Sequence, residues 1–115
     1  MNYQENFKSG KEVILATSSK DGKPNANVVV SLGFVDGKLL LADCQMVTTI
    51  NNLKENPIIC IIGGYLRIRG MVEIFSEGKY FDMCVKENSE YKPKNALLVS
   101  LEEVFDLDKC EKIKI

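Results

Sequence analysis

Two consecutive threonines, Thr48 and Thr49, stand at the predicted start of a short helix. Apolar residues recur there at helical spacing, and the Asn56-Pro57 pair ends the segment. The first turn of a helix has N–H groups without intrahelical partners, and threonine hydroxyls add further donors. The segment could therefore bind an anion such as a phosphate. Helix capping by the same hydroxyls is the alternative, and the local sequence leaves both open.

Histidine is absent, and the four cysteines, Cys44, Cys60, Cys84 and Cys110, form no CxxC pair. We therefore expect no metal site. The usual general base and the common nucleophilic triads are also missing, so an enzyme with this sequence would depend on a cofactor or on carboxylates. Cys60 and Cys84 lie in apolar surroundings and are expected to be buried, reduced thiols, which leaves Cys44 as the cysteine placed for chemistry. No catalytic residue is assigned.

The chain has 115 residues, of which 45% are apolar, and a net charge of -1. These values predict a single folded domain over residues 1–115 and exclude intrinsic disorder. The balanced charge gives no global field that would attract nucleic acid or an anionic membrane. The longest apolar run, Ile58 to Leu66, is too short to span a bilayer, and the N-terminus lacks the pattern of a secretory signal. A soluble, cytoplasmic protein is expected.

Turn residues and apolar periodicity predict six or seven short strands with two or three short helices. The strands cover Glu12–Thr17, Asn25–Phe34, Lys38–Ala42, Pro57–Ile62, Tyr65–Phe75, Ala96–Ser100 and Lys109–Ile115, and the clearest helices start at Thr48 or Thr49 and span Glu77–Lys86. Asp36-Gly37 is a strong hairpin signal between the second and third strands. Evenly spaced short strands with few helices predict a mainly β fold, a small antiparallel barrel.

The second predicted strand has two unlike faces. Asn25, Asn27 and Ser31 share one face with Val29. The other face is apolar and consists of Ala26, Val28, Val30, Leu32 and Phe34. One side of this strand is therefore dry, and the other is partly polar.

Two segments carry a resemblance to a known family. They read Leu15-Ala-Thr-Ser-Ser-Lys-Asp-Gly-Lys-Pro-Asn-Ala-Asn-Val-Val-Val and Leu39-Leu-Leu-Ala-Asp-Cys-Gln-Met-Val-Thr-Thr-Ile-Asn-Asn-Leu-Lys-Glu-Asn-Pro57. Both resemble the FMN-binding split barrels related to pyridoxamine 5′-phosphate oxidase, and the similarity runs from about Glu12 to Phe75. It implies a six- to seven-stranded antiparallel split β-barrel. It also implies a homodimer with FMN at the subunit interface.

The resemblance further implies which residues contact the cofactor. The polar face of the second strand would lie toward the flavin, with Asn27, Val28, Val29 and Ser31 as contacts. The loop passing the flavin would contain Asp43, Cys44 and Met46, although Met46 also fits as the first apolar contact of its helix. Thr48 and Thr49 match the residues that grip the FMN phosphate.

Many members of the family carry Lys or Arg where this sequence has Thr48, so a cation for the phosphate must come from elsewhere. Arg67 and Arg69 are candidates because a guanidinium offers a fixed fork of donors. A solvated strand face that pairs with Glu73 or with the dimer partner is the alternative. Tyr91 would stack on the flavin edge, with the neighbouring lysines of Tyr91-Lys92-Pro93-Lys94 facing a negatively charged substrate or phosphate. An ordinary basic loop is the alternative there.

FMN carries redox chemistry itself, so no catalytic acid is required. The leading interpretation is an FMN-dependent oxidoreductase acting on a small-molecule substrate. The pyridoxamine 5′-phosphate oxidase reaction is disfavoured, because those enzymes are longer and end in an Arg-x-His type segment, whereas this sequence ends at Lys112-Ile-Lys-Ile115. The alternatives are a non-enzymatic electron carrier or flavin store, and a relative that binds a deazaflavin or haem. The haem alternative is less favoured, because the sequence has no histidine that could serve as an axial ligand.

Overall fold

The computed structural model describes residues 3–44, 46–88, 90 and 92–115. Its elements in chain order are the 3-10 helix η1 (Tyr3–Phe7), β1 (Glu12–Ser18), β2 (Pro24–Val35), β3 (Lys38–Asp43), α1 (Thr48–Glu55), β4 (Ile58–Gly63), β5 (Leu66–Phe75), α2 (Lys79–Glu87), β6 (Asn95–Asp106) and β7 (Glu111–Ile113). Among the described residues, no helix is long and apolar enough to cross a membrane.

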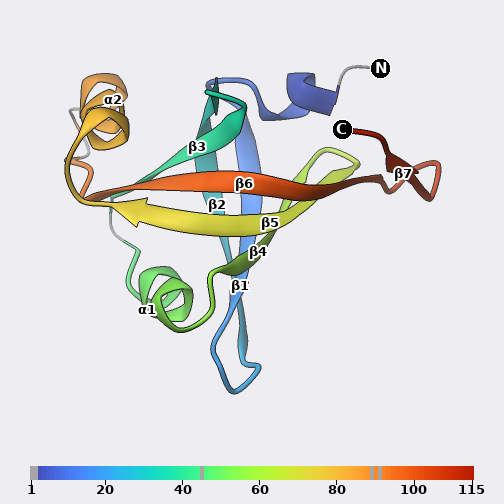
Figure 1. Cartoon of the computed structure of the whole chain (residues 1–115), viewed down its shortest axis with the longest axis horizontal. Coiled ribbons are helices and arrows are strands. Elements are labelled where there is room, and N and C mark those ends of the chain that lie inside the picture. Colours follow the sequence, from blue (N-terminus) through green and yellow to red (C-terminus); the bar gives the residue numbers. More distant parts are fainter. Residues whose placement is uncertain (1–2, 45, 89, 91) are drawn as a thin grey trace.

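The strands form one antiparallel sheet in the order β3-β2-β1-β4-β5-β6-β7. An additional pairing between β3 and β6 closes the first six strands into a barrel, and β7 extends the sheet beyond it. In Figure 1, α2 lies at one end of the long β5–β6 pair and β7 at the other. The predicted mainly β fold, a six- to seven-stranded antiparallel split barrel with short helices, is confirmed.

The predicted hairpin between β2 and β3 is also confirmed. Val35 pairs with Lys38, and both turn residues have positive φ, 54° at Asp36 and 79° at Gly37. This is the combination that a two-residue type I′ turn requires. The last two strands differ from the prediction, because β6 continues to Asp106 and β7 is only three residues long. Pairing along the whole of β5, rather than the apolar run, sets the length of β6.

The N-terminal η1 closes one end of the barrel. Phe7 is completely buried, and a Cβ on Gly63 would lie 2.7 Å from its ring, so the glycine leaves room for the phenyl group. The buried Ser31 hydroxyl donates to the Phe7 carbonyl at 2.6 Å and accepts from the Gly33 N–H at 2.9 Å. These contacts fasten the start of the chain to β2.

One face of β2 points into the barrel and the other points outward. The row with Val29 and Ser31 points into the barrel, where both residues are buried. The apolar row faces outward, and Val28 is 66% exposed and Val30 46% exposed. The polar character of one face therefore does not mark the solvent side of this strand, because that face is closed by α1 and η1.

The prediction that Cys60 is buried is wrong, because side chains alternate between the two faces of β4. Its neighbours Ile59 and Ile61 point into the core, whereas Cys60 lies on the outer face of β4 and is only partly covered. A continuous apolar run predicted burial on both faces, but only the inner face of β4 is packed. Cys84 is fully buried, as predicted, between α2 and the β3–β6 ladder.

Candidate functional site

A groove opens where β2 and β3 separate. In the described chain their pairing begins at Ser31–Leu41 and continues after a register shift to the hairpin, so the earlier part of β2 runs without β3 beside it. The cavity left there has a volume of about 390 Å³. It is lined by Val28, Val29, Val30, Ala42, Cys44, Met46 and Asn88. This volume falls within the range of roughly 300–1,000 Å³ that is typical of small-molecule sites.

The groove has main-chain as well as apolar walls. Ser31 directs its N–H to the Lys11 carbonyl at 2.8 Å and its own carbonyl to the Gly10 N–H at 2.9 Å, both toward β1. Main-chain groups alternate in direction along a strand, so those of Val28 and Val30 point to the opposite edge, where β3 has turned away. A planar ligand in the groove would meet this strand edge.

The start of α1 borders the same groove through Met46. The N-cap residue, Val47, makes no side-chain capping bond, so the N–H groups of the first turn are left for another acceptor. Thr48 is exposed at this position. The first turn contains no acidic residue that would oppose an anion. The geometry therefore fits an anion-binding helix start.

Thr49 has a different environment from Thr48. It is 1% exposed, and its hydroxyl donates to the side-chain amide oxygen of Asn27. The Asn25 amide donates to the Thr49 hydroxyl at 3.1 Å and to the Asn27 side-chain oxygen at 2.9 Å. This network ties the first turn of α1 to β2, so the Thr49 side chain holds the helix in place.

Asp43 lies behind the loop that forms the groove wall. Its side chain is 1% exposed, and its two oxygens accept bonds from the Met46 N–H at 2.8 Å and from the Asn95 amide at 2.7 Å. A buried carboxylate needs such partners to offset its lost hydration. Asp43 therefore fastens the end of β3 both to the approach to α1 and to the start of β6.

The half-buried Cys44 thiol faces the groove. Burial, and then the charge of Asp43, raise the pKa of this thiol above its ordinary value. Burial raises the pKa of Cys84 to about 11. Both groups therefore stay protonated at neutral pH and are poor nucleophiles.

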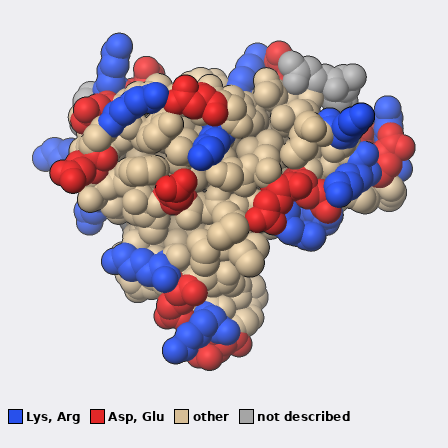
Figure 2. Space-filling view, viewed as in Figure 1, with Lys and Arg blue, Asp and Glu red and all other residues tan. Residues whose placement is uncertain are grey.

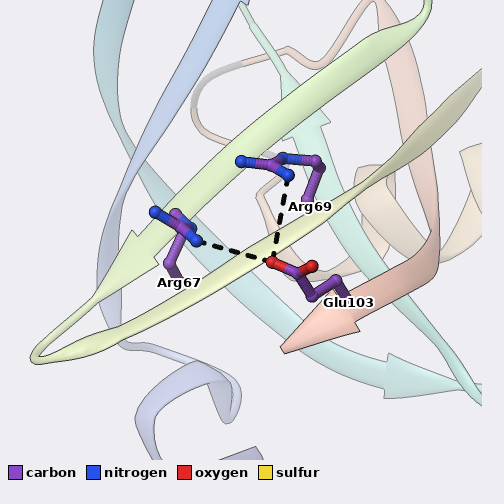
Figure 3. A network of polar contacts seen from close by, with 3 residues as sticks. All are labelled: Arg67, Arg69 and Glu103. Atoms are coloured by element: carbon purple, nitrogen blue, oxygen red, sulfur yellow. Dashed lines mark hydrogen bonds and ion pairs between the residues drawn. The ribbon is translucent and has the colours of Figure 1, made fainter. Parts of the chain in front are cut away.

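Arg67 and Arg69 share one carboxylate on the outer face of the sheet. Figure 3 shows both guanidinium groups directed from β5 toward Glu103 on β6, at 3.4 Å and 3.9 Å. Arg67 also lies over the Phe105 ring at 4.9 Å. Glu73, the predicted partner, instead lies 3.9 Å from Lys38. β1 and β4 separate these arginines from β2 in the sheet, so one chain does not bring them to the start of α1.

The family model for pyridoxamine 5′-phosphate oxidase matches residues 2–108. The chain belongs to the pyridoxamine 5′-phosphate oxidase-like family. A curated relative is an uncharacterized protein of Methanocaldococcus jannaschii, 29% identical over 83% of this chain and 72% of that protein. The family assignment agrees with the resemblance that the two sequence segments carry.

Solved structures with the same fold include several relatives. HupZ of Group A Streptococcus has a TM-score of 0.83 at 20% identity, with 96% of this chain and 95% of HupZ covered. An FMN-binding protein of Syntrophomonas wolfei has a TM-score of 0.74 at 17% identity, with 96% and 81% covered. An F420 reductase has a TM-score of 0.71 at 18% identity, with 92% and 98% covered. The split barrel thus occurs in proteins named for FMN and for a deazaflavin.

The structure brings several of the predicted contact residues together in this family member. Val28, Val29, Cys44 and Met46 line the groove, and Thr48 stands at the exposed start of α1. Asn27, Thr49 and Asp43 lie beside it, with side chains engaged within the protein. Tyr91 lies outside the described residues.

Other predicted residues lie elsewhere, and three lining residues were missed. Ser31 is buried under η1 and is absent from the groove lining, as are Arg67 and Arg69. The lining residues that sequence reasoning missed are Val30, Ala42 and Asn88. Val30 and Ala42 adjoin residues that were predicted, whereas no sequence signal marked Asn88, which ends α2 far along the chain.

Substituting Thr49 by valine should destabilise the fold by about 1–3 kcal/mol, because Asn27 and Asn25 lose a buried partner while the side-chain shape is kept. The matched change Thr48→Val alters an exposed side chain and should shift stability by less than about 0.5 kcal/mol. Urea unfolding followed by circular dichroism measures both. Equal stability of the two variants would contradict the role of Thr49 as a tie between α1 and β2.

Proposed function

We propose that this protein binds FMN and acts as an FMN-dependent oxidoreductase on a small-molecule substrate. The observation that carries the proposal is the continuity between the groove beside β2 and the uncapped start of α1. An apolar slot next to an anion-binding helix end suits a molecule with a planar ring and a phosphate. Membership of the pyridoxamine 5′-phosphate oxidase-like family supports the same cofactor class.

The phosphate would bind at the first turn of α1, with Thr48 as the accessible hydroxyl. The ring would lie between the valines of β2 and the loop containing Cys44 and Met46. Apolar contacts would bind the ring faces, and the main-chain groups of Val28 would meet its polar edge. A deazaflavin remains the second candidate, because one relative with this fold is an F420 reductase.

A homodimer would complete the site. Exposed apolar side chains gather on the outer face of neighbouring strands, namely Ile14, Val28, Val30, Ile58 and Met71. Val28 belongs both to this outer apolar face and to the groove lining. A second copy of the chain packed on the face would therefore also cover the groove and exclude water from the bound ring. Burying these apolar side chains against a second copy would favour association.

FMN supplies the redox chemistry when it is bound. The described chain contributes a groove lining without a carboxylate, and the whole sequence contains no histidine. The protein would therefore bind and orient the cofactor, exclude water and admit a second reactant to the ring, without an acid or base of its own. Charges of both signs are interspersed over the face in Figure 2, which gives no general preference for an acidic or a basic reactant.

FMN binding should quench flavin fluorescence and should slow alkylation of Cys44 by iodoacetamide, because a ligand in the groove covers this thiol. The exposed Cys110 should react at the same rate with and without FMN. Mass spectrometry of the alkylated peptides measures both rates, and a parallel titration with F420 compares the two cofactors. Unchanged fluorescence and unchanged Cys44 reactivity with both compounds would contradict the proposed site.

The change Ile14→Lys should convert the dimer into a monomer of half the mass, because it places a charge within the outer apolar face without altering the groove lining. Ile115→Lys is the matched control, since Ile115 is also an exposed apolar residue and follows β7, which extends the sheet beyond the barrel. Analytical ultracentrifugation measures the masses. A dimer that persists in the Ile14 variant, or a wild type that sediments as a monomer, would refute this interface.

If the protein is an oxidoreductase, its bound flavin should be reduced by a nicotinamide donor and then reoxidised by a small acceptor through many cycles. Stopped-flow absorbance at the flavin band measures both half-reactions, and steady-state assays measure turnover. Tight FMN binding without repeated turnover across a panel of acceptors would favour an electron carrier or flavin store. Free FMN at the same concentration is the control for reactions that need no protein.

A further inference from the structure

We infer that Lys94 provides the positive charge that faces the phosphate of the bound flavin nucleotide. The inference rests on the proposed function and identifies a cation for a helix start that has none in its first turn. The polar side chains there are uncharged: Thr48, Thr49, Asn25 and Asn27. A phosphate held by neutral donors alone keeps much of its charge uncompensated.

The two arginines predicted for this task are already paired. Arg67 and Arg69 both contact Glu103, and Arg67 is also stacked on Phe105 (Figure 3). Moving either guanidinium toward a ligand would break one of the two ion pairs of the partly buried Glu103 carboxylate. Arg69 also lies toward the other end of α1, because it shares a cavity with Asn56, the C-cap residue of that helix.

Asp43 brings Lys94 to the loop that leads into α1. The Lys94 N–H donates to the Asp43 carbonyl at 2.7 Å, and the Asp43 side chain accepts from the Met46 N–H and from the neighbouring Asn95 amide. Lys94 is therefore joined through one residue to Met46, a residue of the groove lining. The approach to β6 and the approach to α1 run side by side.

Lys94 lies directly before β6, next to the end of β3 that borders the groove. Asp43 is opposite Asn95 in the β3–β6 register, and their side chains meet on one face. Residues that adjoin this pair project from the other face. On β3 this residue is Ala42, which lines the groove together with Cys44, the residue after the strand, and Lys94 directly precedes β6 and bonds the Asp43 carbonyl beside them.

The ammonium group of Lys94 is available for a ligand. Lys94 is exposed, and within the described residues no carboxylate forms an ion pair with it, in contrast to Lys38 and Lys79, which contact Glu73 and Asp36. A lysine with no internal partner beside a groove can turn toward a bound anion without breaking another contact.

Titration of FMN and of riboflavin into the wild type, Lys94→Met, Lys94→Arg and Lys92→Met tests the inference. Lys94→Met should weaken FMN binding about tenfold or more and leave riboflavin binding within about twofold, because only FMN carries the phosphate. Lys94→Arg should retain most of the FMN affinity. Lys92→Met removes a lysine from the same segment and should bind FMN like the wild type.

Equal FMN affinity of Lys94→Met and wild type would overturn the inference, as would an equal loss for FMN and riboflavin, which would mark a structural effect. A tenfold loss in Lys92→Met but not in Lys94→Met would assign the charge to the other lysine and also overturn it. Failure of the proposed function gives a different result, because the wild type itself would then bind neither flavin.

Discussion

The whole site depends on the point at which β3 loses its pairing with β2. Between Leu39 and Leu41, β3 has β2 on one edge and β6 on the other, but its last two residues pair with β6 alone. A strand cannot follow both neighbours once they diverge, so the first half of β2 keeps only β1 beside it. Strand edges in a protein need partners, and a groove at such an edge offers them to a ligand. The same arrangement of strands therefore closes the barrel and leaves the cavity beside β2.

Asp43 fixes the geometry of this divergence. Its two carboxylate oxygens and its carbonyl accept bonds from three different positions, Met46, Asn95 and Lys94. The two bonds to the buried carboxylate are stronger than bonds to a neutral acceptor, and their loss would be costly. The resemblance to the family implied that Asp43 touches the flavin. In this structure, its contacts hold the end of β3 against the approach to α1 and the approach to β6.

Features set by short-range patterns could be predicted from the sequence. The Asp36-Gly37 turn follows from the backbone conformation that these residues tolerate, and the outward position of Arg67 and Arg69 follows from alternation along β5. The inward orientation of the polar row of β2 could not be predicted, because it depends on the contact between Asn27 and Thr49, which are 22 residues apart. The partner of Arg67 was missed for a similar reason, since Glu103 becomes its neighbour only through the β5–β6 register.

The uncharged start of α1 has a consequence for how the protein can recognise an anion. Helix-end N–H groups and a threonine hydroxyl attract negative charge, but their field falls off within about one turn. Full neutralisation of a phosphate then requires a cation carried by another segment. In this fold the segment next to the loop before α1 is the approach to β6, and its position is set by the same pairing that closes the barrel. On the proposed function, anion recognition would be coupled to barrel closure, and a change that loosens the β3–β6 end would weaken nucleotide binding without altering the helix.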